Sequence, residues 1–131
     1  MKALILPITL FALSACGAAT PRMDADSEAM IDCLASQAVV EISDAVKTGM
    51  EAGKSADALR PIRGKVTDAK LKELQAVYTE QKERTYFEFQ TAKRLNAVQE
   101  ALADPENASS AKTLMDETFA LAQDCTFGPT S

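Results

Sequence analysis

The sequence predicts an all-α fold: an elongated antiparallel bundle of three principal helices plus a short fourth one. Its 131 residues are rich in Ala, Leu, Glu, Lys and Gln, which favour helices, and contain no Trp and no His. Apolar residues recur at spacings of three and four along three segments, as expected for helices that bury one face. Gly and Pro residues separate these segments.

The first helix should begin between Asp24 and Ser27, because acidic residues suit the positive end of the helix dipole. Its pattern continues until Gly49 and Gly53, where we expect the helix to end. The apolar stripe of this helix consists of Ile31, Leu34, Ala35, Ala38, Ile42, Ala45 and Val46.

The next segment, residues 54–66, predicts only one or two helical turns, since Ser55 can cap a helix but Pro61 prevents a long one. A single long helix should then run from Asp68 to about Ala103. Its apolar stripe consists of Leu71, Leu74, Tyr78, Phe89, Ala92, Leu95 and Leu102. The middle of that stripe is polar, with Gln81, Thr85 and Glu88.

Three aromatic residues stand close together in this polar middle, and they cannot all face one partner helix. The favoured interpretation places Phe89 in the core, with Tyr86 and Phe87 against a neighbouring helix or loop. The alternative makes Tyr86 and Phe87 an exposed patch that binds a partner.

The last helix should cover about residues 109–124, after Pro105 ends the long one. Cys125 follows directly, and Phe127 could fold its ring onto the first helix. The stripe that the last helix should bury consists of Ala111, Leu114, Met115, Thr118, Leu121 and Ala122.

The N-terminus has the features of an export signal. Lys2 supplies a positive charge, and residues 3–13 are almost wholly apolar but too few for a transmembrane helix, which needs about 20. Residues 13–16, Leu-Ser-Ala-Cys, resemble the lipobox of bacterial lipoprotein precursors. The alternative is an ordinary signal peptide whose cleavage site happens to contain a cysteine.

The lipobox resemblance implies that residues 1–15 are a signal peptide that is removed and that Cys16 carries the lipid that anchors the chain to a membrane. Residues 16–23 would then be the lipidated cysteine and a tether, and residues 24–131 a single helical domain. Gly17 is not the aspartate that retains lipoproteins in the inner membrane of enteric bacteria. The periplasmic face of the outer membrane is therefore favoured if the source is Gram-negative.

The number of cysteines agrees with export to the envelope. Lipidation of Cys16 leaves Cys33 and Cys125 as a pair in an oxidising compartment. We expect a disulfide between them, and the alternative is two buried free thiols. Such a bond constrains the topology, since the alpha carbons of a disulfide lie within about 7 Å. If residues 54–66 run antiparallel to the first helix, the long helix runs parallel to the first one and the last helix runs antiparallel to it. The end of the last helix then approaches Cys33, as the disulfide requires.

The charge pattern argues against nucleic-acid binding, because the whole chain has a formal net charge of −5 and no basic stripe with interleaved aromatics. Residues 54–94 carry ten basic and six acidic groups and lie between two acidic segments. Packing of the basic segment between the acidic ones is the favoured interpretation. A patch for anionic lipid is the alternative, formed by Arg60, Arg63, Lys65, Lys70 and Lys72.

Catalysis is not expected, because general-base and nucleophile pairs usually draw on histidine, which the chain lacks. No metal or cofactor is expected either. The acidic run at residues 24–28 lacks the Gly and Glu that a calcium loop places further along. We therefore expect a non-catalytic envelope protein, with either an interaction or a structural role and with an envelope protein as its candidate partner.

A second resemblance suggests another function. Met30 stands three residues before Cys33, and residues 83–92 contain an arginine, an aromatic pair and Ala92. These features resemble small, all-helical, lysozyme-inhibitor-like periplasmic lipoproteins, although the Trp and the nearby cysteine of that family's motif are missing. The resemblance implies a small inhibitor or a ligand-binding lipoprotein.

Overall fold

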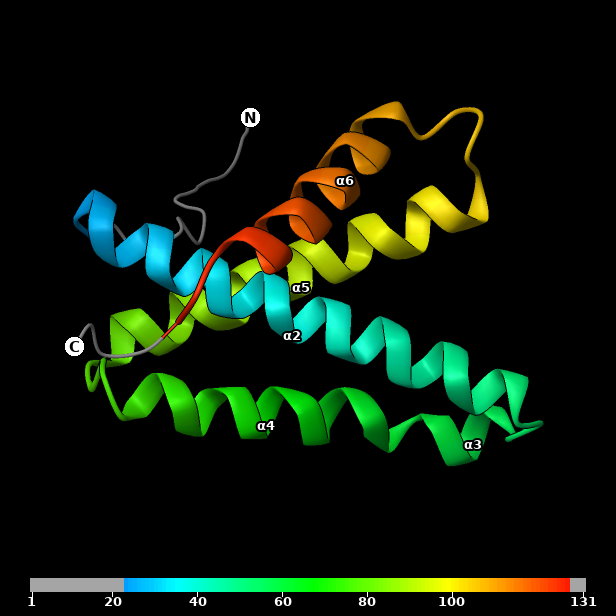
Figure 1. Cartoon of the computed structure of the whole chain (residues 1–131), viewed down its shortest axis with the longest axis horizontal. Coiled ribbons are helices and arrows are strands. Elements are labelled where there is room, and N and C mark those ends of the chain that lie inside the picture. The colour runs from blue at the N-terminus through cyan, green and yellow to red at the C-terminus, as the bar shows by residue number, and fades with distance from the viewer. Residues whose placement is uncertain (1–22, 128–131) are drawn as a thin grey trace, which may run out of the picture.

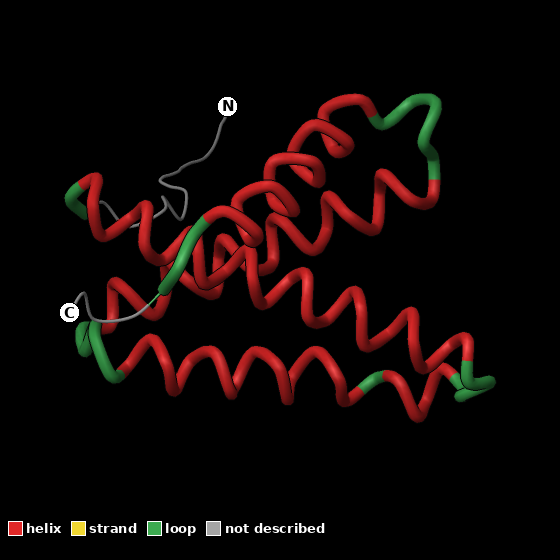
Figure 2. The backbone as a smooth tube through the Cα atoms, viewed as in Figure 1, coloured by secondary structure: helices red, strands yellow, loops and turns green. Residues whose placement is uncertain are grey.

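The structure is a computed structural model, and it describes residues 23–127. Five helices follow one another in this part of the chain, and the all-α prediction is confirmed (Figures 1 and 2). The predicted signal peptide and Cys16 lie outside the described residues. Helix bounds are α2 (Ala25–Glu51), α3 (Ala56–Leu59), α4 (Pro61–Gln75), α5 (Gln81–Ala103) and α6 (Ser109–Asp124).

Helix α2 begins where the acidic residues predicted it. Asp24 is its N-cap, and the Asp24 carboxylate accepts hydrogen bonds from the Ser27 backbone N–H (3.1 Å) and hydroxyl (2.8 Å). These bonds lower the pKa of Asp24. The helix ends at Glu51, between the two glycines where the sequence predicted its end. Gly49 is buried where Leu59 of α3 packs, and a Cβ there would lie 2.3 Å from the Leu59 side chain.

The single long helix predicted for residues 68–103 is wrong. The chain turns between Gln75 and Gln81, and α4 and α5 are separate helices that run in opposite directions (Figure 1). Glu80 starts α5 with a capping box, in which the Glu80 backbone N–H donates to the Glu83 side chain at 2.9 Å. The polar residues Gln81, Thr85 and Glu88 in the middle of the predicted stripe indicated this break. The buried face of α5 does not continue the buried face of α4, so one stripe could not describe both helices.

Helix α4 is also longer at its start than the sequence suggested, because Pro61 stands at the first helical position rather than interrupting a helix. The bundle therefore has four principal helices, α2, α4, α5 and α6, where the sequence predicted three and a short one. The disulfide prediction is confirmed: Cys33 and Cys125 are bonded, with their alpha carbons 5.9 Å apart.

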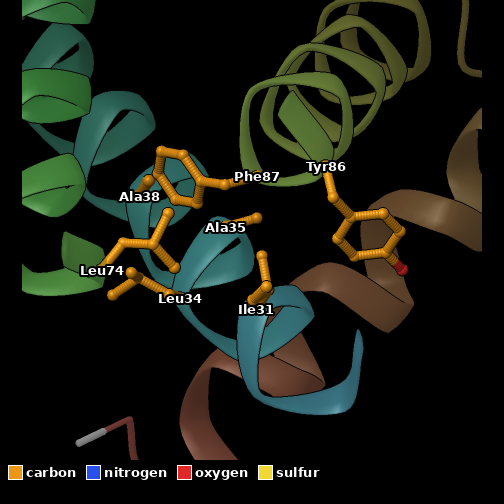
Figure 3. Close-up of a cluster of buried hydrophobic side chains, with 7 residues drawn as sticks. All are labelled: Ile31, Leu34, Ala35, Ala38, Leu74, Tyr86 and Phe87. Carbon is orange, nitrogen blue, oxygen red and sulfur yellow. The ribbon is translucent and has the colours of Figure 1, made fainter. Parts of the chain in front are cut away.

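The four main helices form two pairs, α2 with α4 and α5 with α6, and α2 crosses α5 near the middle of the molecule (Figure 1). Beyond the crossing the pairs diverge toward the end of the molecule that holds α3 and the α5–α6 loop. A first core cluster lies on the side of the N-terminus of α2 and consists of Ile31, Leu34, Ala35, Ala38, Leu74, Tyr86 and Phe87 (Figure 3). A second cluster lies further along α2 and α5 and consists of Val39, Ile42, Leu95 and Val98.

Candidate functional site

Between the diverging helix pairs lies an open groove with a volume of about 670 Å³. We call it the distal groove. Its floor is part of the second core cluster, formed by Ile42 of α2 and by Leu95 and Val98 of α5, which are at most 4% exposed. Pockets of about 300–1,000 Å³ with mostly apolar walls are the usual form of a small-ligand site.

Three apolar side chains surround the mouth of the distal groove, one on each of α2, α3 and α5: Met50, Leu59 and Leu102. Met50 is 63% exposed and Leu102 is 71% exposed. When a ligand covers apolar groups that are exposed at the edge of an apolar groove, the free energy decreases because this surface is removed from water. Two side chains of α6, Met115 and Phe119, complete the wall and are only partly buried.

Charged residues of both signs line the same groove. Asp44, Lys47 and Glu51 follow one another at spacings of three and four on α2, and Arg63 of α4 lines the same groove. None of the four takes part in an ion pair within residues 23–127. The groove therefore combines an apolar interior with a charged rim, which is the arrangement that fixes the orientation of an amphipathic guest.

The distal groove lies far from the N-terminal end of the domain. At 1.5 Å per residue, Met50 is roughly 38 Å along the helix from Ala25. The described N-terminus and C-terminus lie at the end of the molecule opposite to α3 and the α5–α6 loop (Figure 1).

The candidate partner-binding aromatics are not on the surface. Tyr86 is 6% exposed and Phe87 is fully buried, whereas Phe89, which we expected in the core, is 44% exposed. Phe87 points toward Leu74 and Ala38, while Tyr86 projects in another direction (Figure 3). An exposed patch of Tyr86 and Phe87 is therefore contradicted, and so is the core position of Phe89.

Tyr86 belongs instead to a polar cluster between α2, α5 and α6. Burial raises the pKa of Asp32 on α2, although a hydrogen bond with the Tyr86 hydroxyl and the nearby charge of Arg94 oppose the shift. Burial and the same carboxylate raise the pKa of Tyr86. The Arg94 guanidinium donates to the Thr118 hydroxyl at 3.0 Å and ties α5 to α6.

Two of the five residues of the basic patch that the sequence suggested, Arg60 and Lys70, take part in ion pairs. Lys70 contacts both Glu41 of α2 and Glu73, and Arg60 contacts Asp57. The Lys70–Glu41 pair joins α4 to α2, in agreement with packing of a basic helix against an acidic one.

The distal groove could not be recognised from the spacing of its apolar residues, because this spacing is the same as that of core residues. One feature of the sequence could have indicated the groove. Met50 and Leu102 stand near the ends of their helices, where neighbouring helices also end and leave apolar residues uncovered. Within residues 23–127 no helix has the length and hydropathy to cross a membrane, and no cluster of His, Cys, Asp or Glu has the arrangement of a metal site. No protein-family model, curated protein or solved structure matches the chain.

Proposed function

We propose that the mature protein is a lipid-anchored lipoprotein of the bacterial envelope that acts by binding rather than by catalysis, and that the distal groove is its binding site. The anchor rests on the lipobox at residues 13–16. The binding role rests on one observation: a groove of about 670 Å³ lies beside the second core cluster, and two of the apolar side chains that line it, Met50 and Leu102, are 63% and 71% exposed. A purely structural bundle would gain stability by closing this gap.

The lysozyme-inhibitor alternative receives no comparable support. Its motif residues are distributed between the core and the surface, with Phe87 buried and Phe89 exposed. No aromatic pair is left on the surface of α5 to contact an enzyme.

An apolar fluorescent probe tests the binding role. N-phenylnaphthylamine should gain fluorescence with the Cys16→Ser protein, which retains the whole chain without acyl groups. Leu102→Glu should weaken the binding about tenfold, because a charge replaces an apolar contact that the guest buries. Phe89→Glu is the matched control, since it changes an exposed apolar residue of the same helix outside the groove and should leave the binding unchanged.

Absence of probe binding, or equal loss in both variants, would contradict the proposal. The anchor is tested separately by cell fractionation. The wild-type protein should sediment with membranes and the Cys16→Ser protein should not. If both fractionate with membranes, lipid on Cys16 is not the anchor.

A further inference from the structure

The start of α2, the turn between α4 and α5 and the end of the described chain lie at one end of the molecule (Figure 1). We call it the tether end, because the residues before Met23 connect it to Cys16. Met23, Tyr78 and Phe127 all pack against the first core cluster, and the rings of Tyr78 and Phe127 lie 6.3 Å apart. Three distant parts of the sequence therefore meet where the chain leaves the domain toward its predicted lipid.

The turn between α4 and α5 is the uncharged part of the tether end. Residues 74–79 carry no charge, although charged residues make up 25% of the chain. Val77 is 36% exposed, Ala76 and Thr79 are exposed, and Tyr78 is partly buried. Exposed apolar side chains beside a tyrosine suit the boundary between water and a bilayer, because one part of such a surface is apolar and the other is polar.

The length of the tether limits how the domain can sit on a membrane. Cys16 precedes Met23 by seven residues, which span at most about 25 Å when extended. The other end of the molecule also exposes apolar side chains, Met50 and Leu102, but Met50 is roughly 38 Å along α2 from Ala25. The domain cannot stand on that end, because the tether would then have to span more than its full length.

We infer that the turn at residues 75–79 is a lipid-contacting tip, which rests on the headgroup surface of the membrane in which Cys16 is anchored. This inference rests on the proposed lipid anchor and adds the orientation of the domain. A tip of this size binds a bilayer weakly by itself, but the short tether keeps its effective concentration at the surface high. Met50 and Leu102 then lie at the end away from this membrane, so a partner of the distal groove approaches from the periplasm.

The charges beside the tip indicate which lipid surface it suits. Asp24 caps α2 and Glu80 caps α5, and both are exposed carboxylates at the tether end. A strongly anionic surface repels carboxylates, whereas the ammonium groups of a zwitterionic lipid such as phosphatidylethanolamine attract them. The tip should therefore contact phosphatidylethanolamine more readily than phosphatidylglycerol.

The test uses the lipidated protein in vesicles made mostly of phosphatidylethanolamine, with an environment-sensitive fluorophore on one introduced cysteine. Thr79→Cys labels the tip, Ala56→Cys labels α3 at the opposite end, and Lys65→Cys labels the exposed side of α4. The label at position 79 should emit at shorter wavelength and be quenched by brominated lipids, and the other two labels should not. Vesicles rich in phosphatidylglycerol should reduce this quenching.

A substitution in the tip checks that the turn itself makes the contact. Val77→Asp in the Thr79→Cys protein should abolish most of the emission shift, because a charge replaces the exposed apolar side chain. Leu102→Asp is the matched control, since it makes the same kind of change at the opposite end and should leave the shift unchanged. Melting temperatures of all variants show whether each is folded.

The outcomes separate this inference from the proposed anchor. If the protein floats with the vesicles but the labels at positions 79 and 56 behave alike, the anchor stands and the inferred orientation is wrong. Stronger quenching at position 65 than at position 79 would also overturn the inference, because the domain would then lie on α4. If the protein does not float, the anchor fails and the inferred orientation fails with it.

Discussion

Cys33 and Cys125 are 92 residues apart in the chain, and their alpha carbons lie 5.9 Å apart in the fold. Cys33 lies in the first third of α2 and Cys125 directly follows α6, so the bond fixes the end of the last helix against the first one. The Gln37 side-chain amide donates to the Cys125 carbonyl at 3.2 Å and holds the same junction.

Removal of this bond should destabilise the domain considerably. The Cys33→Ala/Cys125→Ala protein should lose about 2–4 kcal/mol of free energy of unfolding, mainly because the unfolded chain becomes less restricted. Urea unfolding with and without a reductant measures the effect. Reductant should lower the stability of the wild type toward that of the variant, and an unchanged wild type would show that the bond contributes little.

Phe87 and Phe89 provide a matched pair for testing the orientation of α5. Phe87→Ala should cost about 3–5 kcal/mol, because it leaves a cavity in the first core cluster. Phe89→Ala should cost roughly 1 kcal/mol at most, since this ring is already 44% exposed. Chemical denaturation of both variants checks the difference, and a reversed order would place the wrong face of α5 against α2.

The hydrogen bond between Arg94 and Thr118 should contribute to stability. Thr118→Val keeps the shape of the side chain but leaves a buried guanidinium without this partner, at a cost of about 1–3 kcal/mol. Thr113→Val on the same helix is the control, because that exposed hydroxyl donates only to the Ser109 carbonyl. Equal losses in thermal or urea unfolding would argue against a specific role for Arg94.

Asp32 should make the domain less stable as the pH rises from acid toward neutral. Its pKa is raised in the fold, so the folded state holds the proton more tightly than the unfolded state does. The stabilisation is fully present below the usual pKa of 3.8 and is lost as the pH rises through the folded value. Glu28 strengthens the shift, whereas Lys93, Arg94 and Tyr86 oppose it.

The variant Asp32→Asn should remove this part of the pH dependence and gain stability over the wild type on going from pH 3 to pH 7. Tyr86→Phe should extend to higher pH the range in which protonated Asp32 stabilises the fold, because it deletes a hydrogen bond that lowers the pKa of Asp32. Urea unfolding across this pH range gives both slopes. Parallel curves for the wild type and Asp32→Asn would contradict the shift.

Much of the fold could be predicted from the sequence. The capping by Asp24, the bounds of α6 and the Cys33–Cys125 pairing all follow from local or chemical rules, because each depends on a few residues and their spacing. The turn between α4 and α5 was not predicted, since a continuous helix was expected there. It contains neither Gly nor Pro, and its signals are the unfavourable helix formers Val77, Tyr78 and Thr79 and a capping box that uses Glu80.

That turn depends on tertiary contacts. Tyr78 packs against the first core cluster, and its ring lies 6.3 Å from that of Phe127, beyond the C-terminus of α6. The attraction between two residues so distant in sequence favours the turn over a continuous helix. The prediction that Phe127 could fold its ring onto the first helix agrees with its packing against the same cluster, which contains Ile31 and Leu34 of α2.

The sequence by itself determined the helical class and the pair of cysteines that form a bond, because composition and short motifs carry these properties, and lipid attachment at Cys16 stays a prediction. Only the tertiary structure decided which aromatics are buried and where the distal groove lies. Both depend on the angle at which α2 crosses α5, which separates Met50 from Leu102 and leaves the distal groove between them. A crossing angle results from side-chain packing between helices and is not encoded in the periodicity of either one.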